Sequence, residues 1–117
     1  IKLPVSAPFH SSLMNKATEI MKIELGKLNF KKGNNVLISN ITADEISNSN
    51  ELKDLLIKQI ENRVRWRESV INMINKKVTQ FIEIGPGKVL SGLIKRVNKD
   101  IKITSINSEE DIKTIEI

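Results

Sequence analysis

Phe81-Ile82-Glu83-Ile84 followed by Gly85-Pro86-Gly87 is the stretch that decides the fold of this 117-residue chain. Three of its first four residues are large and apolar, which predicts a buried strand, and the glycines and the proline end that strand abruptly. Apolar residues then recur at helical spacing, which predicts a helix from Lys88 to Val97. A strand, a tight turn and a helix in this order indicate an α/β fold.

The rest of the chain continues the alternation of strands and helices. Ile101 to Ile106 alternates apolar and polar residues as a final strand, and Val36 to Ile41 is a β-branched stretch that predicts another. Residues 1 to 8 carry Pro4 and Pro8 and are expected to be extended. Helices are predicted over residues 11–28, 48–60, 66–74, 88–97 and 109–115. Strands separated by helices imply a three-layer, mostly parallel sheet with flanking helices.

The glycine turn after Ile84 also invites a second interpretation, a phosphate-binding loop. Its spacing matches neither the Gly-x-x-x-x-Gly-Lys-Ser/Thr loop nor the Gly-x-Gly-x-x-Gly fingerprint. Phosphate binding is therefore the minor interpretation of this turn.

Composition limits the classes of protein to which the chain can belong. Hydrophobic residues make up 39% of the chain, enough for a core, and aromatic residues only 3%, too few for the stacking platforms of single-strand nucleic-acid binders. There is no cysteine, which excludes a disulfide-stapled secreted domain. No apolar stretch approaches the roughly 18 to 20 residues that span a bilayer, and none resembles a signal peptide. We expect a soluble, cytoplasmic protein.

The chain is basic, with a formal net charge of +5 that could attract phosphates, a membrane or an acidic protein. Arginines alternate with other residues from Arg63 to Arg67 around Trp66, an arrangement that resembles a nucleic-acid contact. On a helix, however, Trp66 faces inward and the arginines fan outward, so a solvated helix start is the simpler interpretation. A non-catalytic basic module that binds an acidic protein or nucleic acid through this segment, Lys95 and Arg96 stays the alternative to an enzyme.

His10 is the only histidine of the chain and lies at a predicted turn between the extended segment and the first helix. An imidazole titrates near neutral pH, so this residue is the best candidate for a general acid or base. Ser11 and Ser12 are natural helix caps and poor nucleophile candidates, and no Gly-x-Ser-x-Gly elbow occurs in the chain. One histidine and no cysteine leave no recognisable metal-ligand spacing, so we expect no metal site.

Two stretches of the chain match a known family. Leu3 to Met14 and Phe81 to Arg96 resemble the carboxy-terminal part of the malonyl-CoA:acyl-carrier-protein transacylases, the acyltransferases of type II fatty-acid synthesis. The segment Val64 to Val70 is similar to the one that joins these motifs in the family. The chain starts at Ile1 without an initiator methionine, which also favours a piece of a longer protein.

The resemblance implies that residues 1–117 form the carboxy-terminal portion of the large, hydrolase-like subdomain of an acyltransferase. The serine elbow, the arginine that clamps the malonyl carboxylate, the oxyanion amides and the small ferredoxin-like subdomain would then lie upstream of Ile1. The chain would supply the general base without the nucleophile, so we expect it to be inactive alone.

The resemblance also implies the roles of three residues. His10 matches the catalytic histidine, which acts as a base toward the serine and the thiol and as an acid toward the leaving groups. Gln59 matches the residue whose backbone carbonyl orients that histidine in place of a triad aspartate. Phe9 matches the bulky residue of malonyl-selective members, which would crowd out a branched α-methyl group. The alternative is that Phe9 only packs the turn.

The implied reaction moves a malonyl group from coenzyme A to the phosphopantetheine thiol of acyl carrier protein through an acyl-serine. The coenzyme A thioester and the phosphopantetheine are substrates here, so the resemblance implies no cofactor. The expected partners are malonyl-CoA and acyl carrier protein, with no nucleic acid and no membrane.

Overall fold

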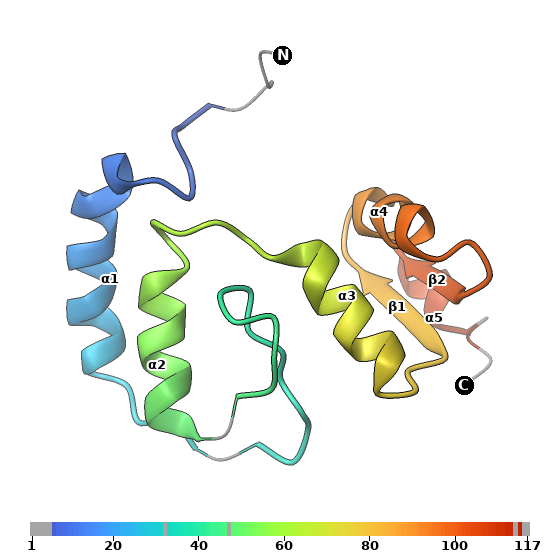
Figure 1. Ribbon diagram of the computed structural model, residues 1–117, viewed down its shortest axis with the longest axis horizontal. Helices are drawn as coiled ribbons and strands as arrows, with labels where there is room; N and C mark the ends of the chain where they lie inside the picture. The colour runs from blue at the N-terminus through green and yellow to red at the C-terminus, as the bar shows by residue number, and fades with distance from the viewer. Residues whose placement is uncertain (1–5, 32, 47, 114, 116–117) are drawn as a thin grey trace. The chain divides into compact units, whose positions relative to one another are not determined.

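The computed structural model describes residues 6–31, 33–46, 48–113 and 115. The chain divides into two compact units, Ile1–Ser69 and Val70–Ile117, each of which has its own arrangement of elements (Figure 1). The first unit is helical and the second contains the sheet. The α/β class expected from the sequence is confirmed.

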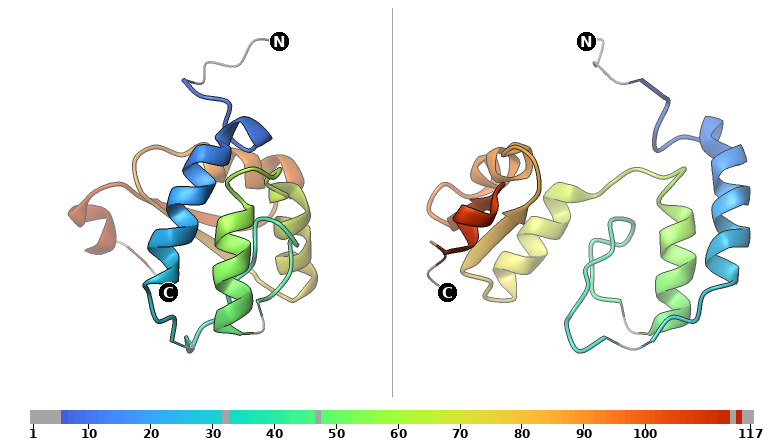
Figure 2. Two further views of the ribbon diagram at one scale, coloured as in Figure 1. Left: turned by 90° about the vertical axis from the view of Figure 1, so that its left-hand side faces the viewer. Right: turned by 180° about the vertical axis from the view of Figure 1, so that it is seen from behind.

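The first unit contains a short 3-10 helix, η1 (Ser12–Met14), and the helices α1 (Asn15–Gly26) and α2 (Ser49–Lys58). The helices α1 and α2 are in contact and run side by side in opposite directions (Figures 1 and 2). The side chain of Asn48 accepts hydrogen bonds from two backbone N–H groups in the first turn of α2, which fixes where this helix begins.

The predicted strand from Val36 to Ile41 is wrong. The segment forms only an isolated antiparallel bridge between Ile38 and Glu45. The reason lies in the turn that follows, because the Ser39 hydroxyl accepts hydrogen bonds from the backbone N–H groups of Ile41 and Thr42. Such side-chain bonds to the local backbone compete with a strand ladder.

The extended segment expected at the start of the chain falls mostly on residues 1–5, which lie outside the described residues. Ser6 and Ala7 form a bend, and Pro8 is not part of a strand.

The second unit is built around a parallel pair of strands, β1 (Gln80–Ile84) and β2 (Lys102–Ile106), in which Gln80 pairs with Lys102 and Ile84 with Ile106. The helix α4 (Val89–Val97) connects the strands and packs on both of them (Figure 1). The helix α3 (Trp66–Asn75) precedes β1, and the short helix α5 (Glu109–Lys113) follows β2 and contacts it.

In the second unit Ile94 of α4 is buried, and so are Ile101, directly before β2, and Ile106, the last residue of β2. The prediction that Phe81 to Ile84 is a buried strand is wrong for one face of β1, because Ile82 is 42% and Ile84 79% exposed. These two side chains point away from the face on which Glu83 contacts α4, since successive residues of a strand alternate between faces. The described residues form a sheet of two parallel strands with helices beside it, which agrees with the predicted α/β class.

No helix within the described ranges is long and apolar enough to cross a membrane.

Candidate active site

His10 lies in a turn that runs from Pro8 to Ser11 and leads into η1. The Ser11 hydroxyl donates a hydrogen bond of 2.8 Å to the carbonyl of Pro8, and the backbone N–H of Met14 donates to the carbonyl of Ser11 at 3.0 Å. His10 adopts φ = 61°, a left-handed conformation that is uncommon for any residue other than glycine. A backbone strained in this way persists only where the surroundings hold it in place, and such positions cluster at functional sites.

The end of α2 holds His10 in place through two hydrogen bonds. The ring nitrogen Nδ1 lies 2.8 Å from the carbonyl oxygen of Gln59, and the backbone N–H of His10 donates to the carbonyl of Ile60 at 3.2 Å. Gln59 is the C-cap of α2, and the last carbonyls of a helix lack partners within it. The structure therefore brings together two predicted site residues that lie 49 positions apart.

The contact with Gln59 decides which ring nitrogen of His10 carries the proton. A carbonyl oxygen can only accept a hydrogen bond, so Nδ1 must carry the hydrogen and donate it. In the neutral ring the other nitrogen, Nε2, then has a free lone pair and can accept a proton. The side chain of His10 is exposed, so Nε2 is available as a general base.

The two neighbours of His10 differ in their contacts: the Ser11 side chain bonds to the local backbone, whereas Phe9 is exposed. The Ser11 hydroxyl donates to Pro8 and accepts from the backbone N–H of Leu13 at 3.4 Å, as expected of a helix cap. Phe9, directly before His10 in the chain, is 56% exposed. Its role in selectivity stays a prediction.

Glu83 is a residue of local importance that sequence reasoning missed. Its two carboxylate oxygens accept hydrogen bonds from the backbone N–H groups of Leu90 and Ser91, at 3.0 and 2.8 Å, and from the Ser91 hydroxyl at 2.5 Å. The hydrogen bonds from Ser91 and Leu90 hold the pKa of Glu83 below its usual value. Two of the N-terminal donors of α4, which a phosphate would need, are thus taken by the chain's own carboxylate. The geometry does not favour the phosphate-binding interpretation.

Two arginines of the basic segment, Arg63 and Arg65, make contacts within the chain. Glu68 accepts from Arg63 Nη2 at 3.3 Å and lies 3.5 Å from Arg65 Nε, while Arg65 Nη1 donates to the carbonyl of Thr42 at 3.1 Å. In the second unit, Lys95 Nζ donates to the carbonyls of Lys99 and Ile101. These contacts do not favour the alternative of a basic binding module.

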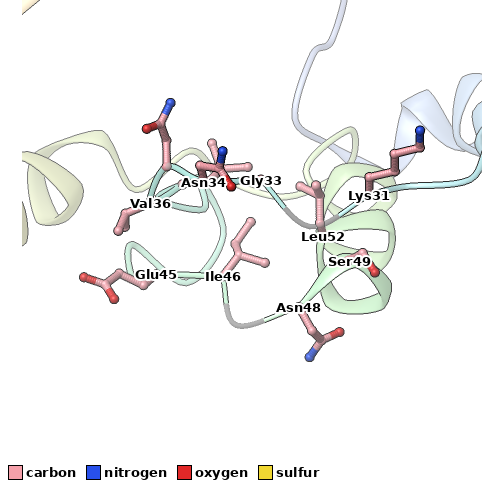
Figure 3. Close-up of a pocket in the computed structure, with 11 residues that line it drawn as sticks. Lys31, Gly33, Asn34, Val36, Glu45, Ile46, Asn48, Ser49 and Leu52 are labelled. Carbon is pink, nitrogen blue, oxygen red and sulfur yellow. The ribbon is translucent and has the colours of Figure 1, made fainter.

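The described residues of the first unit line two hollows of different size, among others. The larger, of about 450 Å³, lies between the loop of residues 33–46 and the start of α2. Ile46 and Leu52 face the same space there, and Glu45 points outward (Figure 3). It contains neither His10 nor Gln59. The smaller, of about 210 Å³, is lined by Gln59 and by Asn40, and it is the one that adjoins the candidate site.

Asn40 is a second residue that sequence reasoning missed. Its amide nitrogen Nδ2 donates a hydrogen bond of 3.1 Å to Oε1 of the Gln59 side chain. No pattern in the sequence marks this residue, since it falls within the stretch predicted as a strand.

Among the described residues no group of three or more histidine, cysteine or carboxylate side chains could hold a metal ion.

Comparison with known proteins shows which proteins this chain is similar to. The relatives are malonyl CoA-acyl carrier protein transacylases, as the resemblance in the sequence indicated. That of Bacillus subtilis (strain 168) is 44% identical over 113 residues, which are 97% of this chain and 36% of that protein. The chain thus spans about a third of the length of the curated relatives it matches.

Solved structures give the same result. The malonyl CoA-acyl carrier protein transacylase from Clostridium perfringens superposes with a TM-score of 0.89 at 36% identity, covering 97% of this chain and 36% of that one. A type II PKS acyl-carrier protein in complex with its malonyl-transacylase matches at a TM-score of 0.88 and 30% identity, over 96% of this chain and 36% of the other. No family model matches the chain.

Proposed function

We propose that this chain is part of a malonyl-CoA:acyl-carrier-protein S-malonyltransferase and supplies its general acid/base, His10. The observation that carries the proposal is the 2.8 Å contact between His10 Nδ1 and the Gln59 carbonyl, which leaves Nε2 as the basic nitrogen. The close similarity to transacylases supports it. The nucleophilic serine would come from the part of the relatives' length that this chain does not span.

In the first half of the reaction, Nε2 of His10 takes the proton of the serine hydroxyl as the oxygen attacks the thioester carbonyl of malonyl-CoA. The bond between this carbonyl carbon and the coenzyme A sulfur then breaks. The imidazolium returns the proton to the leaving thiolate, so the products are malonyl-serine and free coenzyme A.

In the second half, Nε2 takes the proton from the phosphopantetheine thiol of acyl carrier protein. The thiolate attacks the malonyl ester, the bond to the serine oxygen breaks, and the imidazolium protonates that oxygen. The histidine therefore carries one proton in each half-reaction and ends unchanged. In both halves the Gln59 carbonyl keeps Nδ1–H as the donor, and its hydrogen bond strengthens when the ring is positively charged.

The remaining features of the proposal concern the whole enzyme. Residues 1–117 would be the carboxy-terminal portion of the large, hydrolase-like subdomain, where the strands β1 and β2 would join further strands in a three-layer, mostly parallel sheet. Its partner would be acyl carrier protein, as in the complex of the relative named above. We propose a cytoplasmic role in fatty-acid biosynthesis, with malonyl-CoA as substrate and no cofactor, metal, nucleic acid or membrane required.

The test is a chimeric enzyme in which this chain replaces the matching stretch of the Bacillus subtilis relative. We expect the chimera to transfer malonyl from malonyl-CoA to holo acyl carrier protein. Replacing His10 by alanine should lower kcat/KM about 10²- to 10⁴-fold, the usual contribution of a general acid/base. Mass spectrometry of the carrier protein measures the transfer.

The matched control is Asn15→Ala, which removes a side chain that donates a hydrogen bond to Glu61, in the turn that follows α2, and that has no bond to the imidazole. Its activity should stay within about twofold of the parent chimera, as for most exposed substitutions. A folded chimera whose turnover is the same with and without the His10 imidazole would contradict the proposal.

A further inference from the structure

The side chain of Gln59 is held in place by a residue with no assigned part in the site. Gln59 is half-buried, and its carbonyl and its amide group point to different partners. The carbonyl accepts from His10 Nδ1, while the side-chain oxygen Oε1 accepts from Asn40 Nδ2 at 3.1 Å. Gln59 therefore connects Asn40 to the imidazole.

Asn40 itself sits on a turn that several hydrogen bonds close. The backbone N–H of Ser39 donates to the carbonyl of Asp44 at 2.9 Å, and that of Ala43 to the carbonyl of Ser39 at 2.9 Å. Both Ser39 and Ala43 are buried. The carbonyl of Asn40 accepts the backbone N–H of Arg65 at 2.8 Å. The amide of Asn40 is thus presented to Gln59 from a fixed backbone.

The end of α2 needs such support because the last turn of a helix lacks several internal hydrogen bonds. The backbone N–H of Gln59 still donates to the carbonyl of Leu55 at 3.0 Å, but the next residue, Ile60, no longer bonds four residues back. A tether on the Gln59 side chain limits rotation of the peptide that carries the acceptor for His10.

We infer that Asn40 is a positioning residue for the general base, acting through the side chain of Gln59. It holds the Gln59 carbonyl toward Nδ1, and this keeps the imidazole in the tautomer whose Nε2 is basic. The effect of Asn40 on catalysis rests on the proposed function. Its effect on the tautomer of His10 is a property of this chain alone.

The structural part is tested in the ¹⁵N-labelled 117-residue chain, in which His10 is the only histidine, so its ring signals need no assignment. Long-range ¹H–¹⁵N spectra distinguish a protonated Nδ1 from a protonated Nε2. We expect Nδ1–H to predominate at a pH where the ring is neutral. Asn40→Leu keeps the branched shape of the side chain but removes the donor, so it should shift the population toward Nε2–H. Gln59→Met removes the acceptor of the same hydrogen bond and should have the same effect.

The double variant tests whether the two residues act through one contact. Because both substitutions remove the same hydrogen bond, the tautomer ratio of the double variant should equal that of either single variant. Asn62→Leu is the matched control, since Asn62 Nδ2 donates to the carbonyl of Lys58 in the same helix end without touching Gln59. It should leave the ratio unchanged. A tautomer ratio that stays the same in both single variants, or that changes equally in the Asn62 control, would overturn the inference.

The catalytic part is tested in the chimera. Asn40→Leu and Gln59→Met should each lower kcat about tenfold with KM for malonyl-CoA unchanged, because a base displaced by a fraction of an ångström loses rate and not substrate binding. If turnover requires the His10 imidazole but neither variant changes kcat, the inference fails and the proposed function stands. If the tautomer ratio responds but turnover does not require His10, the proposed function fails alone.

Discussion

At the scale of single residues, the site depends on the unusual backbone of His10. A histidine at φ = 61° needs more than its own sequence neighbours to hold it, and the support comes from Gln59 and Ile60 at the end of α2. His10 could be identified from the sequence alone, because it is the only histidine and precedes a helix. Its pairing with Gln59 could not, because nothing in local spacing links residues 49 positions apart; that expectation came from resemblance.

Phe9 offers a test of substrate selectivity at the same scale. Phe9 is 56% exposed and directly precedes His10, so under the proposed function it can limit the space next to a bound acyl group. In the chimera we expect Phe9→Ala to raise the ratio of kcat/KM for methylmalonyl-CoA to that for malonyl-CoA about tenfold, since one methyl group in a pocket is worth about 10- to 200-fold. Competition between the two thioesters measures this ratio.

Phe9→Leu serves as the conservative variant, which keeps most of the bulk and should change the ratio less than alanine does. If Phe9 only packs the turn, both substitutions should lower the two activities equally and leave the ratio as it was.

At the scale of elements, helices were predicted well and one strand was not. Capping residues mark helix ends locally, as Asn48 does for α2. The stretch from Val36 to Ile41 has the composition of a strand, but a strand needs a partner, and the hydrogen bonds of Ser39 form a turn in its place. Asn40 was missed for the same reason, because its function as a partner of Gln59 exists only once that turn has formed.

Glu83 gives a prediction about the junction between β1 and α4. Because the pKa of Glu83 is lowered in the folded chain, its carboxylate adds stability above the ordinary pKa of a glutamate. This contribution is lost as the pH falls through the lowered, folded-state pKa. We expect Glu83→Gln to reduce the thermal unfolding midpoint at pH 7, and the difference from the parent chain should shrink as the solution is made acidic.

Circular dichroism melts between pH 7 and pH 3 measure this difference. Glu19→Gln, at an exposed position of α1, is the control and should leave the midpoint nearly unchanged at every pH. If the loss of unfolding midpoint caused by Glu83→Gln stays constant down to pH 3, the carboxylate does not stabilise the fold through its charge.

The packing of α4 on the sheet gives a prediction with a magnitude. Ile94 is 3% exposed, so Ile94→Ala should lower the free energy of unfolding by about 2–5 kcal/mol, the usual cost of truncating a buried aliphatic side chain. Leu90→Ala, four residues earlier on the same helix and 40% exposed, should cost clearly less. Urea titration followed by circular dichroism compares the two, and equal losses would contradict the proposed core.

At the scale of the whole molecule, the chain carries the proposed base but no serine elbow. We therefore expect the purified 117-residue chain to transfer no malonyl to holo acyl carrier protein above the rate of the buffer, because the covalent step needs the serine. The chimera, assayed in parallel, is the positive control. Turnover by the chain alone that disappears on replacing His10 would place the nucleophile among these 117 residues.

The anchoring of His10 to the end of α2 has a consequence for how the proposed enzyme responds to heat. Helix ends open locally at a lower free-energy cost than the whole fold, so the turn that carries Gln59 frays before the domain melts. Each such opening frees the imidazole while the rest of the structure persists. Heat inactivation would then begin reversibly, several degrees before any loss of helix content, and cooling would restore the enzyme without refolding.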